Sequence, residues 1–206
     1  MNKKTLLGLI VSCVVVGWML APVLAGKGPC ACAVAVASAS ELTDAEAADL
    51  QFMREEEKLA RDVYNAMYEL YGQRVFSNIP RAEQHHMDAI LGLINAYGLE
   101  DSIKKKPGKF RNTELQKLYN DLVARGAKSR EEAYLVGALI EEVDIKDLED
   151  AMRRTGKEDL LAVFDNLIGG SKRHLNAFVR NYEAVSGKTY VAQKMPQVEI
   201  DAILGR

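Results

Sequence analysis

Apolar residues recur three and four positions apart along most of the chain after residue 40, and no long stretch alternates with a period of two. The first spacing places residues on one face of an α-helix, whereas strict alternation is typical of a strand. The pattern predicts four long helices at 44–71, 79–97, 130–154 and 157–185. Between the second and third of these it predicts a loop at 98–112 and a short helix at 114–125. We therefore expect an all-α protein.

Capping boxes, in which Ser or Thr precedes Glu or Gln by three residues, mark four predicted helix starts. The pairs are Thr43 with Glu46, Thr113 with Gln116, Ser129 with Glu132, and Thr155 with Glu158. The second long helix opens differently, with Asn78 ahead of Pro80, because proline is favoured at a helix start. Glycines that favour the left-handed conformation mark the helix ends at Gly72, Gly98, Gly126 and Gly187.

The lengths of the connections predict the topology. The first two and the last two long helices are joined by short segments, so each pair should form an antiparallel hairpin. About 30 residues separate the hairpins, which is enough to cross the length of a helical bundle. We expect a ferritin-like four-helix bundle, with two antiparallel hairpins joined by a long crossover that contains the short extra helix.

The inward stripe of each long helix is apolar at both ends and polar in the middle. These polar residues are Glu57, Glu83, His86, Glu141, Asp144 and His174. Mid-helix positions of an antiparallel bundle meet at one level, where unpaired carboxylates would repel one another and raise each other's pKa. Two metal ions would relieve the repulsion, and oxygen-plus-imidazole ligation suits iron or manganese. His85 faces elsewhere, as a surface residue or a support for the ligands.

Each of these residues also has a purely structural interpretation. Glu57 ends a run of three glutamates, which is usually a solvated face, and Glu83 with His86 could be a surface pair. The neighbour of Glu141 is also a glutamate, so the phase of that helix stays open, and His174 follows two basic residues that suggest a helix edge. The agreement in depth across four helices favours the metal site.

The first two helices resemble those of rubrerythrin-type proteins. The segment Glu57-Lys-Leu-Ala-Arg-Asp-Val-Tyr64 resembles their Glu-x-x-Ala-Arg-x-x-Tyr motif, and Glu83-x-x-His86 resembles the Glu-x-x-His of their second helix. The resemblance implies that Glu57 is a carboxylate ligand, Glu83 a bridging carboxylate and His86 an imidazole ligand. It also implies that Tyr64 lies beside the site and hydrogen-bonds a carboxylate, which would tune the metal.

The last two helices resemble the same family less closely. Glu141-x-x-Asp144 resembles a Glu-x-x-Glu motif with aspartate in place of one glutamate, and Ser171-x-x-His174 matches a Glu-x-x-His motif only in its histidine. Glu141 and His174 would be ligands. Because a hydroxyl replaces a carboxylate at Ser171, one metal position is weakened unless Asp144 supplies the missing ligand. A site for one metal ion, or for none, is the alternative.

The span 44–204 is also similar to an uncharacterised prokaryotic domain family of the ferritin-like superfamily. The likeness lies in the segments 56–64, 136–148 and 170–174, and it brings no established activity. No Cys-x-x-Cys pair follows the predicted helices, so a rubredoxin-type iron centre is not expected and electrons would come from an external donor. We expect a di-iron or manganese carboxylate protein that reacts with O2 or peroxide, as an oxidase or peroxidase. The alternative is a non-enzymatic structural or partner-binding bundle whose metal site is degenerate or absent.

Composition and charge argue against a nucleic-acid partner. The chain has 206 residues, of which 48% are apolar and 27% charged, with a net charge of −2, as in globular proteins. The one short basic run, Lys104–Lys106, is expected to be a solvated loop, so no nucleic-acid partner is predicted. The oligomeric state stays open, with a homo-oligomer as one alternative.

The N-terminus has the pattern of a secretory signal. Lys3 and Lys4 precede an apolar stretch that ends in Val23-Leu24-Ala25, so we expect a signal peptide at 1–25, a linker at 26–40 and the helical domain at 41–206. The protein would be exported to the periplasm, the cell surface or the medium. Membrane contact is expected only if the apolar segment stays uncleaved as an anchor. The helical domain contains no cysteine; the three cysteines are Cys13, Cys30 and Cys32, and the last two are too close for an easy mutual disulfide.

Overall fold

The computed structural model describes residues 41–206, which form six α-helices and no strand. The helices are α1 (Asp44–Tyr71), α2 (Val75–Ala96), α3 (Thr113–Gly126), α4 (Arg130–Arg154), α5 (Glu158–Ser186) and α6 (Gln197–Leu204). The prediction of an all-α protein is confirmed. The predicted signal at 1–25 and linker at 26–40, with all three cysteines, lie outside the described residues. No helix within 41–206 is both long and apolar enough to cross a membrane.

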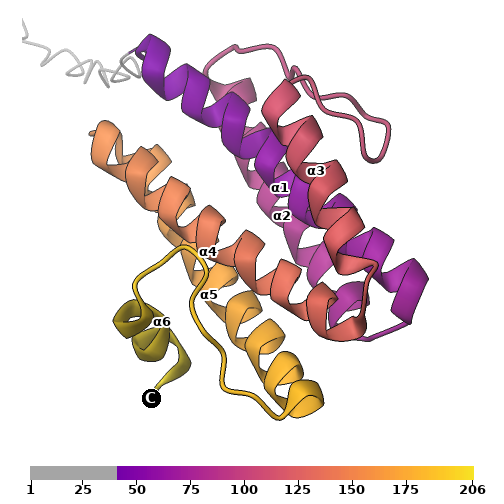
Figure 1. Ribbon diagram of the computed structural model, residues 1–206. Coiled ribbons are helices and arrows are strands. Elements are labelled where there is room, and N and C mark those ends of the chain that lie inside the picture. Colours follow the sequence, from indigo (N-terminus) through magenta and orange to yellow (C-terminus); the bar gives the residue numbers. More distant parts are fainter. Residues whose placement is uncertain (1–40) are drawn as a thin grey trace, which may run out of the picture. The chain divides into compact units, whose positions relative to one another are not determined.

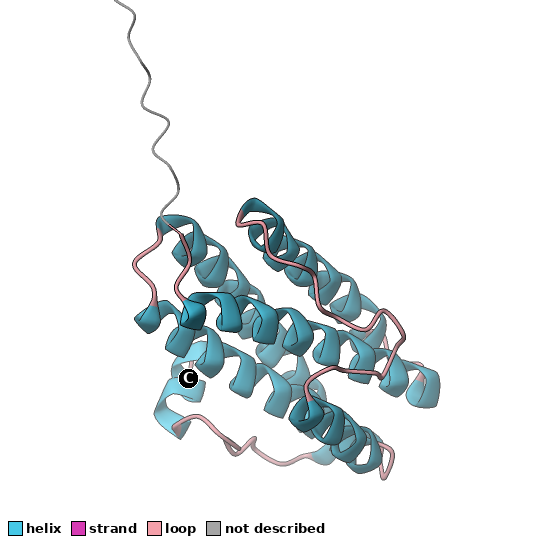
Figure 2. Ribbon diagram, turned by 90° about the horizontal axis from the view of Figure 1, so that it is seen from above, coloured by secondary structure: helices cyan, strands magenta, loops and turns pink. Residues whose placement is uncertain are grey.

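The four long helices pack as two hairpins around one core. α1 lies along α2, and α4 lies along α5, while α1 also contacts α4 and α2 contacts α5 (Figure 1). The short helix α3 packs against α1 and α4, and α6 packs against α5. Figure 2 shows the same arrangement from above. The inward faces of α1, α2, α4 and α5 therefore meet in the middle of the domain.

Aromatic rings fill the core next to its polar centre. The rings of Phe76 and Tyr134 are stacked with their centroids 5.5 Å apart, and Phe178 lies 4.9 Å from Tyr64 and 5.5 Å from Phe76 by the same measure. All four side chains are buried. Rings at such separations stabilise one another beyond the area that they bury, so this cluster holds the helices together on one side of the polar centre.

Two of the predicted N-caps are confirmed. The Thr43 side chain accepts a hydrogen bond from the backbone N–H of Glu46, whose carboxylate accepts one in return from the Thr43 N–H. Ser129 caps α4 by accepting from the N–H of Glu132. Gly72 and Gly187 end α1 and α5 with φ angles of 61° and 68°, the left-handed conformation in which a glycine is least strained.

Other helix boundaries differ from the prediction. α2 begins at Val75 and contains Pro80, because proline removes only the bond to the residue four positions before it and the preceding turn can form. Asn112, rather than Thr113, caps α3 by accepting from the N–H groups of the first turn. Thr155 donates instead to a carboxylate of α1. The last helix, α6, was not predicted, because its eight residues carry too short a pattern.

The glutamate run at the start of the α1 motif is not a solvated face, contrary to its structural interpretation. Glu55 accepts hydrogen bonds from the backbone N–H groups of Arg111 and Asn112, at 2.6 and 2.8 Å. Lys58 donates to Asp62 at 2.6 Å and to two carbonyl oxygens of the crossover at 3.2 Å. These side chains face the crossover because its backbone groups need partners away from water.

Glu142 resolves the phase of α4. Its side chain is buried and faces the segment between α5 and α6, where its carboxylate accepts from the Tyr190 hydroxyl at 2.5 Å and from the Met195 N–H at 2.8 Å. Backbone N–H groups of Gln193 and Lys194 also donate to it. Because Glu142 faces this segment, the preceding Glu141 points into the core.

Candidate metal centre

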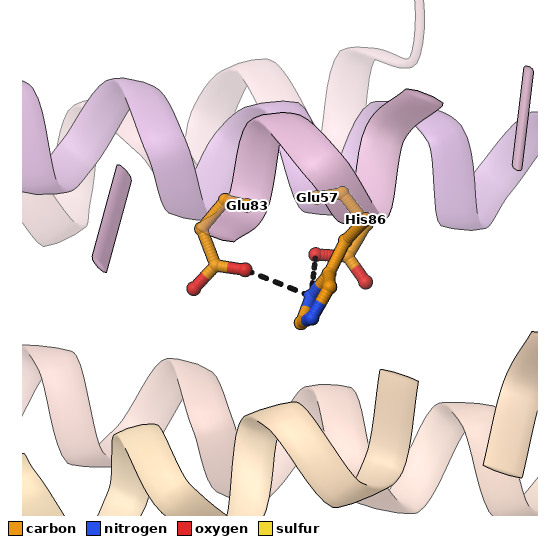
Figure 3. Close-up of side chains that lie close together, drawn as sticks. All are labelled: Glu57, Glu83 and His86. Atoms are coloured by element: carbon orange, nitrogen blue, oxygen red, sulfur yellow. Dashed lines mark hydrogen bonds and ion pairs between the residues drawn. The ribbon is translucent and has the colours of Figure 1, made fainter. Parts of the chain in front are cut away.

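Four helices bring the predicted acids and imidazoles together between them. Glu57 comes from α1, Glu83 and His86 from α2, Glu141 and Asp144 from α4, and His174 from α5. The four carboxylate residues are 1–4% exposed to solvent, and the two histidines are 9% exposed. Figure 3 shows Glu57, Glu83 and His86 projecting from the first hairpin toward the second.

The first group of potential ligands is Glu57, Glu83 and His86. The Nδ1 atom of His86 lies 2.9 Å from Glu83 Oε2 and 3.2 Å from Glu57 Oε2 (Figure 3). One potential ligand atom from each residue lies within 4.8 Å of the others. The i, i+3 spacing of Glu83 and His86 puts both on the same face of α2, so a single helix supplies two of the three groups.

The second group is Glu83, Glu141 and His174, which meets the same distance limit. His174 Nδ1 lies 2.9 Å from Glu83 Oε1 and 3.6 Å from Glu141 Oε2. Glu83 therefore belongs to both groups and turns one carboxylate oxygen toward each imidazole. The two rings lie 5.5 Å apart between centroids. A carboxylate shared in this way can bridge two metal ions.

Asp144 lies beside these groups but belongs to neither. Its Oδ2 atom accepts a hydrogen bond of 2.5 Å from Ser171, whose hydroxyl also lies 3.1 Å from the carbonyl oxygen of Leu167. The Oδ1 atom of Asp144 is buried and has no hydrogen-bond partner within the described residues. One carboxylate oxygen is thus tied to α5 and the other is free to act as a ligand.

Tyr64 lies where the family resemblance implies. Its hydroxyl donates a hydrogen bond of 2.6 Å to Glu141 Oε1, and the ring is fully buried. This bond holds one oxygen of Glu141 away from His174 and leaves the other oxygen facing it. His85 is exposed, in agreement with its interpretation as a surface residue.

Charge in the metal-free site is concentrated on Glu83 and the two imidazoles. Burial works against ionisation of Glu83, but the close imidazoles of His174 and His86 outweigh it and lower its pKa to about 2. Burial likewise opposes protonation of His86, but Glu57 and Glu83 outweigh it and raise its pKa to about 11. Glu141 and Glu83 raise the pKa of His174 to about 10 in the same way.

The other carboxyl groups hold their protons more tightly than usual. Burial raises the pKa of Glu57 to about 7, and burial together with the charge of Glu83 raises the pKa of Glu141. Burial raises the pKa of Asp144 well above its usual range, and nearby carboxylates add to the effect. Without a metal, the cluster therefore stays compact by retaining protons that a cation could replace.

Several buried atoms of the cluster lack the hydrogen bonds that burial normally requires. Within residues 41–206 these are Glu57 Oε1, Glu83 Oε1, Asp144 Oδ1 and His174 Nδ1. Glu83 Oε1 and His174 Nδ1 are close, but their orientation does not make a hydrogen bond. Buried polar atoms without hydrogen-bond partners are costly in a core, and a metal ion between them would satisfy them. The residues present thus fit a metal pair.

Gly170 contributes to the site although the sequence analysis did not select it. A Cβ atom at this position would overlap the His86 ring, with Cε1 at 2.7 Å. The ring of His86 therefore packs directly on the backbone of α5. The sequence carries a sign of this contact, which is the pair Gly169-Gly170 inside a long predicted helix. Glycines inside a helix lower its stability, so such a pair often marks close packing.

Comparison with known proteins shows the same helical domain elsewhere. A family model described as "Uncharacterized protein domain (DUF2202)" matches residues 46–206. The "Uncharacterized protein MJ0754" of Methanocaldococcus jannaschii is 41% identical over 167 residues, which cover 79% of this chain and 88% of that protein. The crystal structure of hypothetical protein MJ0754 from Methanococcus jannaschii DSM 2661 is similar with a TM-score of 0.77 at 40% identity, covering 80% of this chain and 94% of that one.

Proposed function

We propose that this chain, which belongs to the family of the uncharacterized protein domain (DUF2202), binds two iron or manganese ions inside a ferritin-like four-helix bundle. The observation that carries the proposal is the position of Glu83, whose two oxygens each lie 2.9 Å from a different imidazole Nδ1. Dimetal carboxylate sites occur in bundles of two helical hairpins joined by one long crossover. In these bundles carboxylates and Glu-x-x-His pairs face inward, as they do here.

The residues of the cluster would divide between two positions. Glu57 and His86 would hold one ion, Glu141 and His174 the other, and Glu83 would bridge them. Asp144 would add a carboxylate oxygen in place of the glutamate that is absent at Ser171. A donor set of carboxylate oxygens with one imidazole per ion favours iron or manganese over the softer metals that thiolates select.

The chemistry that we propose is the reduction of a small oxidant. Two ferrous ions held at this site would supply the two electrons that, with two protons, reduce one hydrogen peroxide molecule to two water molecules. Tyr64 Oη keeps Glu141 oriented toward the site by hydrogen bonding. The aromatic cluster around Tyr64 excludes water from that side of the core. An external donor would restore the electrons.

Metal content tests the proposal directly. Purified protein from cells grown with added iron and manganese is expected to contain about two equivalents, by analogy with bundle sites of this type. The double change His86→Ala and His174→Ala should remove them, and His85→Ala, which alters an exposed histidine of the same helix, should not. Elemental mass spectrometry measures all three proteins. Wild-type protein without metal, as stable as the double variant, would rule the proposal out.

A structural or partner-binding role is the second candidate. It is favoured by one observation, which is that Glu83 pairs with both imidazoles through its two carboxylate oxygens. In that case the cluster is a buried polar network that specifies how the two hairpins dock. Added metal would then leave the thermal unfolding temperature unchanged, whereas a metal site would raise it.

Export is a separate part of the proposal. The apolar segment 6–24 with its preceding lysines supports it. Expression of the full chain in a bacterial host, followed by N-terminal sequencing of the periplasmic fraction, tests it. A mature N-terminus near Gly26 is the expected result, and recovery of the intact chain in the cytoplasm would contradict it.

A further inference from the structure

A hollow on the solvent side of α5 gathers basic side chains. It has a volume of about 530 Å³, and the C-terminal helix α6 contributes Ile203 to its lining. Small-molecule sites in proteins commonly have volumes of about 300 to 1,000 Å³, so the hollow can hold a small ligand. The polar side chains that line it all come from α5 and are Lys172, Arg173, Asn176, Arg180 and Asn181.

The three cations of this hollow have no acid beside them. No carboxylate within residues 41–206 lines it, and in that part of the chain Lys172, Arg173 and Arg180 make no ion pair or hydrogen bond. Glu149 and Glu199 line the adjoining hollow together with Lys172, but neither forms an ion pair with it. An anion that enters the hollow would therefore meet three positive charges whose N–H donors are free.

The cations are spread along α5 rather than gathered at one point. A helix rises 1.5 Å per residue, so Arg173 and Arg180 are about 10 Å apart along the axis. The Nη1 atom of Arg173 lies 3.7 Å from the position that a Cβ of Gly169 would take, so this guanidinium extends away from Arg180. Lys172 shares the face of Arg180, two turns away. A ligand that contacts all three cations needs more than one anionic group.

The donor chemistry of the hollow suits phosphate. A guanidinium presents paired N–H donors that bind phosphate oxygens two at a time, and an ammonium adds a point charge. The Asn176 amide has no hydrogen bond within the described residues and is a further donor. The wall from α6 contributes only Ile203, so the hollow offers little apolar surface to an organic body. Recognition would therefore depend on the anionic groups themselves.

We propose that this hollow between α5 and α6 binds an anionic ligand that carries two or more linked phosphate groups. Arg173 and Arg180 hold separate phosphate groups, and Lys172 adds a third positive charge. The inference does not rest on the proposed metal site, because none of these three side chains belongs to the cluster of carboxylates and imidazoles. It also gives α6, which lies outside the four-helix core, a function as one wall of a binding site.

Calorimetric titration with tripolyphosphate tests the site. The wild type should bind this probe, and the double change Arg173→Ala with Arg180→Ala should weaken binding at least tenfold. Both side chains are exposed, so the fold should persist, which circular dichroism checks. Arg111→Ala is the matched control, because it removes an exposed arginine outside the hollow and should leave the affinity unchanged. A wild type that does not bind, or a double variant that binds equally well, would overturn the proposal.

The titration is repeated after a chelator has removed any metal, because phosphates themselves bind metal ions. The affinity should stay the same, whereas binding that disappears with the metal would place the probe on the metal and overturn the site. A protein that holds no metal but binds tripolyphosphate would defeat the metal proposal alone.

Two further probes define the ligand class. Orthophosphate should bind more weakly than tripolyphosphate, and equal affinities would overturn the requirement for linked phosphates. Citrate carries several carboxylates instead of phosphates and should also bind more weakly. An equal affinity for citrate would show that the hollow selects charge alone and would overturn the assignment to phosphate.

A substitution on α6 tests the position of the site. Ile203→Glu places a carboxylate on the wall and should weaken binding of tripolyphosphate at least tenfold by repulsion. Val198→Glu is its control, because it adds the same charge to the same helix at a side chain that is 74% exposed and lies outside the hollow. Equal affinities in these two variants would show that the ligand binds elsewhere.

Discussion

The hydroxyl of Ser171 donates a hydrogen bond of 2.5 Å to the carboxylate of Asp144. Both side chains are buried, and they join α4 to α5 beside the cluster of carboxylates and imidazoles. The short polar residue on α5 and the acid on α4 therefore occupy together the place where one longer carboxylate side chain would fit.

Moving the carboxyl group from α4 to α5 tests this relationship. Asp144→Ser should lower the metal content from about two equivalents to about one, because the second position loses its extra carboxylate. The double change Asp144→Ser with Ser171→Glu should restore it, since the acid then reaches the site from α5. Elemental analysis of the two variants gives the answer. Full metal content in Asp144→Ser would show that Asp144 is not a ligand.

Glu83→Gln should affect both metal positions at once. Its carboxylate is shared by the two groups, so the neutral amide should remove most of both equivalents. In the metal-free protein the same change leaves two buried imidazolium groups without their acid and should lower the free energy of unfolding by about 3 kcal/mol. Denaturant unfolding and metal analysis measure the two effects. Glu69→Gln, on the exposed face of α1, is the control and should alter neither.

Tyr64→Phe should weaken the His174 side of the site more than the His86 side. The change removes the hydrogen bond of 2.6 Å to Glu141 and nothing else of similar strength. Loss of a bond that orients a ligand typically reduces metal affinity about 10- to 100-fold. Competition with a chelator should show that one equivalent of metal is bound more weakly than in the wild type and that the affinity for the other is unchanged. Equal weakening of both equivalents would argue against this assignment of Tyr64.

The metal-free protein should lose stability as the pH rises, first above about 4.5, where Glu57 and Glu141 would release their protons in the unfolded chain, and further above about 6.5, where the unfolded histidines do so. In the folded state the pKa of His86 is raised to about 11 and that of His174 to about 10. A raised pKa stabilises the fold below the unfolded value, and that contribution is lost as the pH approaches the folded value. Chemical unfolding at a series of pH values measures the slope. Bound metal should flatten it, because metal replaces these protons.

Gly170→Ala should disrupt the site through packing alone. The added methyl group would meet the His86 ring, so the variant should bind less metal and unfold at a lower temperature. Gly169→Ala is a close control, because its methyl group meets only Arg173 at 3.7 Å. That change should stabilise the helix by up to about 1 kcal/mol. Equal metal content and stability in both variants would remove the role assigned to Gly170.

Much of the fold could be predicted because local signals agree with the tertiary structure. The start and end of α1 follow from Thr43 and Gly72, whose roles depend only on neighbouring backbone groups. The start of α2 could not be found in this way, because Pro80 lies inside a helix that tertiary packing extends toward its N-terminus. The prediction that Thr155 caps the last long helix was wrong for a similar reason. Its hydroxyl donates a hydrogen bond to Glu46, which is distant in sequence.

The polar centre could be predicted because its residues lie near the middle of the inward face of each of the four long helices. The structure brings those residues together. The sequence alone could not assign the neighbouring charges. Glu55 and Glu142 look like surface residues in a charged run. Each, however, accepts hydrogen bonds from backbone N–H groups of a loop that is far away in sequence. Only the tertiary structure reveals those donors, so periodicity cannot separate a loop anchor from a solvated acid.

The crossover divides the polar cluster evenly. Glu57, Glu83 and His86 precede it, and Glu141, Asp144 and His174 follow it. A protease cut at the exposed run Lys104–Lys106 would therefore give two fragments, each with half of the acids and one imidazole. Neither fragment could assemble the cluster alone. A bound metal would link the hairpin before the crossover to the hairpin after it, and its presence would report that the two hairpins have docked in the correct register.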